Sequence, residues 1–492
     1  MGSAPHSNVK RKKNEISFKC TYEITNYNET QILNYKDSNE INEEILSKIK
    51  ILNGNKKEDL IFLKKFKKIG LNTVCFIIEE KLTNMNFLFN KCSSLKQVEF
   101  ISFDTSQVTE MVAMFQKCEA LEYLDLSKFD TANVTNMECM FNKCNKLKEI
   151  KGIENFDTNN VINMRAMFQK CSELEYLNLS NFNATNVTNM QCMFNKCNKL
   201  KEIQGIENFK TNNVKNMRAM FQECYRLEYL NLSKFRTNNV TDMQFMFNKC
   251  NKLKEIKGIE NFDTNNVINM GSMFQGCSKL EYLNLSNFDT SNVTQMDFMF
   301  CACKNLKKIK GINEFNTSKV LDMKGMFIGC KEIVYLDLSN FNTSNVTNMD
   351  SMFGYCYNLK EIKGINNFNL SNVTHSNEVF KNCDKLKNYQ ELTFLFDENN
   401  NPKFQPIKEL NIVKEDIVVY FTSIDQNIIS YSMKCSNLDI FSSLIDKLCL
   451  EFDELKNKDM YFLANGMILN KNLTLHQNKI KDGAQILINV AD

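Results

Sequence analysis

A cysteine recurs at nearly constant spacing through the middle of the chain, and this repeat constrains the fold more than any other feature. The first two separations are 26 residues, and the later ones alternate between 27 and 26, which gives a longer period of 53 residues. A repeat of this length predicts a solenoid whose coils bury their inner faces only against their neighbours. The twelve repeating cysteines are Cys92, Cys118, Cys144, Cys171, Cys197, Cys224, Cys250, Cys277, Cys303, Cys330, Cys356 and Cys383.

Within one coil, "LEYLDLSKFDTANVTNMECMFNKC" (121–144), the apolar residues form two groups with different spacing. The first group has the LxxLxL pattern of a short strand in a parallel sheet, and it comprises Leu121, Leu124 and Leu126. The second has the i, i+3, i+4, i+7 spacing of a short helix with one buried face, and it comprises Met137, Met140, Phe141 and Cys144. We therefore expect an α+β repeat solenoid with a parallel sheet roughly 60 Å long and short helices.

Every second coil is one residue longer than its neighbours, and each of these coils carries a glycine at the added position. Glycine at an inserted position directly after a strand predicts a bulge that absorbs the extra residue. The five glycines are Gly152, Gly205, Gly258, Gly311 and Gly364.

The repeating cysteines have three alternative interpretations: core residues, redox partners or metal ligands. They lie on the same apolar stripe as the methionines and phenylalanines, where a free cysteine behaves as a small hydrophobic residue. Adjacent coils also bring cysteines within the distance that a disulfide spans, although parallel side chains would point the same way. We expect core packing, and the other two interpretations remain alternatives.

The overall composition argues against several classes of function. The chain has only three histidines in 492 residues, no P-loop, no dinucleotide fingerprint and no HExxH or CxxC motif. The net charge is +3 and no apolar run approaches 18 residues. We therefore expect no enzymatic activity, no cofactor, no metal, no nucleic-acid partner and no membrane insertion.

Two outward columns on the strands are candidate recognition positions. The first alternates lysine with glutamate in neighbouring coils, which predicts cross-strand ion pairs that set the register. The second alternates tyrosine with mostly acidic residues, and tyrosine is enriched at protein interfaces. The candidate protein-binding residues are Tyr123, Tyr176, Tyr229, Tyr282, Tyr335, Glu149, Glu202 and Glu255.

Six N-x-[ST] sequons lie in the turn that precedes the Met-Phe-Cys segment. Asparagine in such a turn caps backbone groups with its side chain, and glycosylation is the alternative use of the same motif. The six residues are Asn133, Asn186, Asn239, Asn292, Asn345 and Asn372.

The motif "FNTSNVTNMDSMFGYCYNLKEI" (341–362) resembles the 26-residue repeats of the BspA-like leucine-rich-repeat family. The resemblance extends over about 88–390 of this sequence. It implies a leucine-rich-repeat solenoid that acts as a binding module, and such modules are often displayed on cell surfaces.

Both ends of the chain differ from the repeats. Residues 1–16 are polar with a basic cluster and no following apolar segment, so we expect a disordered tail, no secretory signal and a cytoplasmic protein. The β-rich residues 17–87 are expected to cap the twelve-coil solenoid of 88–390, and the polar residues 391–414 to form a C-terminal cap and linker.

Residues 415–492 resemble a ubiquitin-like β-grasp domain, with two strands, a helix and two further strands. The resemblance rests on the segment "FLANGMILNKNLTLHQNKIKDGAQILINV", with Gly466 at the turn between two strands. The resemblance implies a docking patch through Ile424 and Leu463, although its third position is Asn489 here. The last residues lack a diglycine, so we expect a domain that is not conjugated to other proteins and that readers from the ubiquitin pathway could recognise.

The leading hypothesis is a non-enzymatic protein-binding scaffold whose recognition surface is the strand face of the solenoid. The alternative is a surface-displayed adhesin of the BspA-like type, which would reach the cell surface by an unconventional route.

Overall fold

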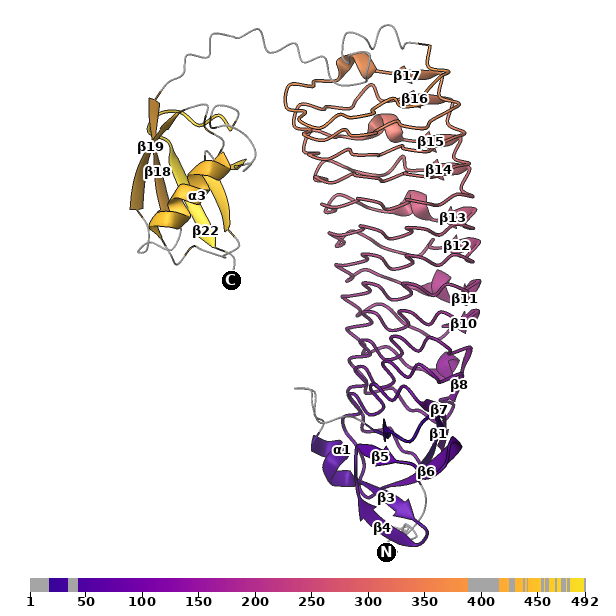
Figure 1. The fold of residues 1–492 in the computed structure, drawn as a ribbon. Helices are drawn as coiled ribbons and strands as arrows, with labels where there is room; N and C mark the ends of the chain where they lie inside the picture. The colour runs from indigo at the N-terminus through magenta and orange to yellow at the C-terminus, as the bar shows by residue number, and fades with distance from the viewer. Residues whose placement is uncertain are drawn as a thin grey trace, which may run out of the picture. The chain divides into compact units, whose positions relative to one another are not determined.

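The computed structural model describes residues 17–33 and 43–387 and, with gaps, 416–490. The chain divides into two compact units between Phe404 and Gln405, and both are drawn in Figure 1. The predicted tail at 1–16 and the predicted linker at 391–414 lie outside the described residues.

A parallel β-solenoid makes up most of the first unit, and Figure 1 shows its coils stacked one on another from β7 (Leu95–Phe100) to β17 (Glu361–Lys363). Eleven backbone bridges link equivalent residues of successive coils, from Asn84 through Glu110 to His375. One hydrophobic core runs without interruption from Phe18 to Leu386.

The short strands between these ends are β8 (Tyr123–Asp125), β9 (Glu149–Lys151), β10 (Tyr176–Asn178), β11 (Glu202–Gln204), β12 (Tyr229–Asn231), β13 (Glu255–Lys257), β14 (Tyr282–Asn284), β15 (Lys308–Lys310) and β16 (Tyr335–Asp337). The helical elements of the solenoid are single 3-10 turns, η1 (Ile153–Asn155), η2 (Ile206–Asn208), η3 (Ile259–Asn261), η4 (Ile312–Glu314) and η5 (Ile365–Asn367).

The prediction of a helix in each Met-Phe-Cys segment is wrong, because the segment is a chain of tight turns. Every fourth residue has a left-handed backbone, as at Cys139 (φ 56°) and Lys143 (φ 64°). Alternate N–H groups therefore point along the solenoid axis and bond to the next coil, as from Phe141 to the Met167 carbonyl at 2.8 Å. The intervening N–H groups bond three residues back within the coil, as from Cys144 to the carbonyl of Phe141 at 3.1 Å. The side chains predicted to be buried are buried, since successive turns repeat with nearly helical spacing.

The predicted single sheet is instead a series of two-stranded parallel ladders along the strand side. β8 pairs with β9, and β10 pairs with β11, with the shorter coil always first in the pair. After β9 the chain turns at Gly152 into η1, so the extra residue is taken up by a left-handed glycine and a 3-10 turn, and not by a bulge. This insertion interrupts the pairing between one ladder and the next.

Glycine is required at the inserted position because two backbones approach closely there. A Cβ on Gly205 would lie 2.5 Å from Cα of Ser180 and 2.6 Å from the carbonyl carbon of Leu179, both in the preceding coil. The φ of Gly205 is +87°, a conformation that side chains with a Cβ rarely adopt. The recurrence of glycine every 53 residues thus has a steric cause.

We predict that Gly205→Ala destabilises the protein by more than about 2 kcal/mol, because left-handed strain adds to a backbone clash. Gly329→Ala is the matched control, since its φ is +73° but its Cβ would meet nothing closer than 3.6 Å. Chemical denaturation of both variants measures the difference, and equal destabilisation would show that the close approach does not matter.

An antiparallel sheet covers the first coil. Its order is β4-β3-β6-β1-β7, so strand β7 belongs to both the first coil and the sheet. Phe18 in β1 stacks on Phe76 at 4.8 Å and meets Phe89 of the first coil edge-on at 5.8 Å. The elements before β7 are β1 (Phe18–Ile24), β2 (Glu29–Gln31), α1 (Glu43–Lys48), β3 (Ile49–Asn53), β4 (Lys56–Asp59), β5 (Leu63–Lys65) and β6 (Gly70–Ile78).

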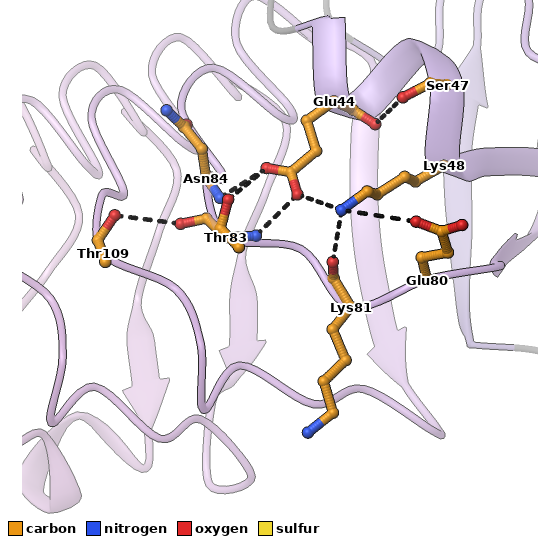
Figure 2. Close-up of polar contacts among 8 residues, drawn as sticks. All are labelled: Glu44, Ser47, Lys48, Glu80, Lys81, Thr83, Asn84 and Thr109. Atoms are coloured by element: carbon orange, nitrogen blue, oxygen red, sulfur yellow. Dashed lines mark hydrogen bonds and ion pairs between the residues drawn. The ribbon is translucent and has the colours of Figure 1, made fainter.

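At the first coil, the carboxylate of Glu44 accepts the hydrogen bonds that a carbonyl accepts in later coils (Figure 2). In each later coil the equivalent N–H donates to the carbonyl of the previous coil, and where the residue is threonine its hydroxyl does so too, as Thr109 does to Thr83. Thr83 has no earlier coil, and its N–H and hydroxyl donate instead to Glu44 at 3.0 and 3.1 Å. The Asn84 N–H also donates to this carboxylate, at 2.9 Å. Glu44 therefore replaces the missing carbonyl.

Lys48, one helical turn after Glu44, holds this carboxylate in place. Its ammonium lies 2.6 Å from the carboxylate and 2.9 Å from the carbonyl of Lys81 (Figure 2). Partial burial raises the pKa of Glu44, but hydrogen bonds from Lys48, Thr83 and Asn84 outweigh it, and the net pKa lies below the usual value. A lowered pKa means that the bound carboxylate stabilises the folded state above its unfolded pKa of about 4.3. This stabilisation is lost as the pH falls through the lowered value.

We expect Glu44→Gln to destabilise the N-terminal coils by about 1 to 3 kcal/mol at pH 7, because charge-assisted hydrogen bonds are lost. Hydrogen exchange at the amides of Thr83 and Asn84 should accelerate, and the difference from the parent protein should shrink in acid. Glu43→Gln is the control, since Glu43 is exposed on the same helix. If Glu44→Gln left the hydrogen exchange of Thr83 and Asn84 unchanged, these amides would not depend on the Glu44 carboxylate.

The second unit is a five-stranded mixed sheet with one helix. The sheet order is β19-β18-β22-β20-β21, with β18 and β22 parallel and the other pairs antiparallel. Helix α3 packs on the sheet through Phe441, whose ring lies 5.3 Å from that of Phe462. The elements are β18 (Asp416–Ser423), β19 (Ser430–Ser436), α3 (Phe441–Glu451), β20 (Met460–Ala464), β21 (Met467–Ile468) and β22 (Gln485–Val490).

Candidate functional site

The repeating cysteines line the core, and the eleven thiols from Cys118 onward bond across coils. Cys144 Sγ donates to the carbonyl of Phe115 in the preceding coil at 3.0 Å, and the other ladder thiols from Cys118 to Cys383 make the equivalent bond at 3.0 to 3.2 Å. All nineteen cysteines are free. The geometry therefore supports the core interpretation, with a hydrogen bond that the sequence spacing alone did not indicate.

Phenylalanines stack beside the thiols. Rings of successive coils from Phe89 to Phe380 lie 5.0 to 5.8 Å apart and within 14° of parallel. Burial raises the pKa of the ladder thiols from Cys92 to Cys330, to about 12 for Cys197 and Cys250, so these groups stay protonated. At the end of the ladder, a hydrogen bond between Cys356 and Cys383 lowers the pKa of Cys383. A nucleophilic role for the buried cysteines does not fit this environment.

Amide side chains form two further ladders. The six sequon asparagines each donate through Nδ2 to a backbone carbonyl of the preceding coil, as Asn186 does to Asn159 at 2.7 Å. This confirms their predicted role in binding backbone groups, although the bond crosses to another coil. The second ladder has alternating asparagine and glutamine, each donating to the next, and it comprises Asn142, Gln169, Asn195, Gln222 and Asn248, ending on Gln275. Sequence reasoning missed this ladder, although the alternation of "MFNKC" with "MFQKC" signalled it.

The five candidate tyrosines each occupy the first residue of a strand in the shorter coils. The ladder pairing sets Tyr123, Tyr176 and Tyr229 beside Glu149, Glu202 and Glu255 respectively. Tyr282 lies beside Lys308, and Tyr335 beside Glu361. The exposed fraction of these five tyrosines ranges from 39% to 60%. They form a column of half-exposed rings, which we call the tyrosine column.

The predicted cross-strand ion pairs flank the tyrosine column. Lys148, Lys201, Lys254 and Lys307 bond to the glutamates of the preceding coils at 2.6 to 2.9 Å. Hydrogen bonds from Lys96 and Lys148 lower the pKa of Glu122 to about 2. Since both partners of these pairs are largely exposed, their net contribution to stability is small.

A family model matches this solenoid in four overlapping stretches, residues 77–152, 145–255, 227–310 and 304–411. The model describes a "Mycoplasma protein of unknown function, DUF285", and its matches extend over more than half of the chain. The chain belongs to the DUF285 family. A comparison with curated proteins finds no match.

The second unit lies beyond the DUF285 repeats, and its two candidate docking residues differ in what the structure shows. Ile424 lies outside the described residues. Leu463 in β20 is half-buried and pairs with Leu487 of β22, which is exposed. Within the described ranges, no three His, Cys, Asp or Glu side chains cluster as metal ligands, and no helix has the length and apolarity to cross a membrane.

The ladder thiols of the DUF285 repeats are expected to resist alkylation. With a pKa of about 12, Cys197 has on the order of a thousandfold less thiolate at pH 8 than a free cysteine does. Iodoacetamide followed by peptide mass spectrometry should leave the native ladder from Cys92 to Cys330 unmodified and label every cysteine after unfolding. Rapid native labelling of Cys197 would contradict its burial.

Proposed function

We propose that this DUF285 protein is a non-enzymatic, cytoplasmic protein-binding scaffold that recognises its partner through the tyrosine column. The observation that carries the proposal is the exposure of five rings at equivalent positions. Within the described part of the chain, none of the five contacts another aromatic ring, so packing among themselves does not account for them. Half-exposed tyrosines offer rigid contact area with a polar tip, and such residues dominate binding energy at interfaces.

The spacing of the column favours an extended partner. Equivalent positions two coils apart are separated by about 10 Å, since parallel strands lie about 4.8 Å apart. Glu149, Glu202 and Glu255 lie between the rings and have no ion pair within the described residues. From Tyr123 to Tyr282 the column therefore presents alternating aromatic and acidic contacts along one direction. Lys201 already lies 5.7 Å from the ring of Tyr176, which shows that a cation can occupy this environment.

The proposal includes a leucine-rich-repeat character of the BspA-like type for the coils and a ubiquitin-like fold for the second unit. The parallel pairing of β18 with β22 at the sheet centre, with α3 between β19 and β20 in sequence, supports a β-grasp arrangement. The second unit would then offer a separate docking surface for ubiquitin-pathway readers. Docking through Ile424 and Leu463 remains a prediction.

Alanine at Tyr176, Tyr229 and Tyr282 tests the tyrosine column. We expect partner capture from native extract, quantified by mass spectrometry, to fall at least tenfold, because each interface tyrosine contributes about 1 to 2 kcal/mol. The matched control replaces Ile162, Ile268 and Leu321 with threonine, the residue that shorter coils carry at this position. These three side chains are also 39% to 51% exposed. Partners that remain bound to the tyrosine variant would contradict the assignment.

The second candidate function is a surface-displayed adhesin, which repetition of a solenoid binding face would also suit. Protease treatment of intact cells separates the two: a cytoplasmic scaffold stays intact, whereas a displayed protein is cleaved.

A further inference from the structure

A lysine occupies the same position in each of the first five coils, immediately before the repeating cysteine. The backbone N–H of each of these lysines donates to the next coil at 2.7 Å, so the five residues are held in register. At a coil spacing of about 4.8 Å they form a row about 19 Å long. We call this row the lysine file, and it comprises Lys91, Lys117, Lys143, Lys170 and Lys196.

The backbone does not require lysine at this position. Every lysine of the file has a left-handed backbone, with φ between 61° and 64°, which favours glycine and asparagine. Later coils carry Gly276, Ala302 and Gly329 at the equivalent position and keep the same inter-coil bond at 2.7 to 2.8 Å. Lysine is therefore retained in five successive coils against the local conformational preference.

The lysines of the file also lack the close ion pairs that lysines make elsewhere on the solenoid, although Glu119 lies two residues after Lys117. On the strand face, lysine alternates with glutamate and the two pair across coils. Among the described residues, Lys91, Lys117, Lys143 and Lys170 make no ion pair, and Lys196 approaches Glu223 only at 3.9 Å. The nearby Glu173 bonds to Lys199 at 2.6 Å instead. Like charges at this spacing repel each other, so an anion bound along the file would relieve the repulsion.

We propose that the lysine file binds a linear phosphate polymer that runs along the solenoid axis. Because the file is one residue wide, it fits a linear polyanion better than the flat anionic surface of a membrane. The residues two positions after each lysine provide no aromatic ring for base stacking, which a single-stranded nucleic acid would use. They are Ser93, Glu119, Asn145, Ser172 and Asn198. Inorganic polyphosphate has the required linear charge and no bases.

Binding of inorganic polyphosphate to the full chain, measured by calorimetry over a salt series, tests the proposal. We expect log K to fall with log salt with a slope of about −4, as for about five neutralised phosphates. Lys117→Asn, Lys143→Asn and Lys170→Asn together should weaken binding at least tenfold and reduce the slope by about two to three. Asparagine tolerates the left-handed backbone, so the melting temperature should not fall.

The matched control removes three lysines from the strand face, as Lys148→Asn, Lys201→Asn and Lys254→Asn. This control should bind polyphosphate like the parent protein, and arginine at the three file positions should retain binding. Equal binding by the file variant and the parent, or equal loss in the control, would overturn the proposal. Tighter binding of oligo-dT or of anionic vesicles than of polyphosphate, with the same dependence on the file, would overturn the choice of ligand.

Discussion

The backbone hydrogen bonds between successive Met-Phe-Cys turns are the interaction on which the rest of this solenoid depends. They form only because a left-handed residue at every fourth position turns alternate N–H groups toward the next coil, as at Cys139 and Lys143. With the coils locked in register, identical side chains lie directly above one another. Phenylalanines then stack, thiols donate to carbonyls, and amide side chains bond to one another, because each ladder needs side chains of the same kind at equivalent positions.

The alternation of longer and shorter coils determines what the outer surface presents. The glycine turn after each longer strand separates the strand side into two-stranded ladders, so its residues repeat every second coil. Tyrosine, glutamate and lysine on that side therefore alternate. The turn side has an uninterrupted ladder, and a lysine repeats there in each of the first five coils. One surface thus combines aromatic groups with paired charges, and the other carries a row of five lysines that ends at Glu223.

A ladder of this kind leaves unsatisfied groups at its first coil, and the N-terminal segment supplies them with partners. The antiparallel sheet extends the core past Phe89, while the Glu44 carboxylate accepts the N–H and hydroxyl bonds that a preceding coil would have received. Its dependence on ionisation makes this end of the solenoid sensitive to acid, whereas the coil-to-coil bonds in the interior are between backbone groups and do not titrate.

The repeat spacing of the cysteines was enough to predict the solenoid, the buried positions and the alternating coil lengths. Each of these features follows from the pattern of residues within one or two repeats. It also identified the outward tyrosines and the charge pairs. The local conformation of the Met-Phe-Cys segment could not be predicted in this way, since tight turns and helices bury residues at nearly the same spacing. The choice between them follows from hydrogen bonds to the neighbouring coils, which are 26 or 27 residues away. The partners of Glu44 and the uncompensated lysine file were likewise decided only by tertiary structure, because they depend on which charged groups lie within reach across coils.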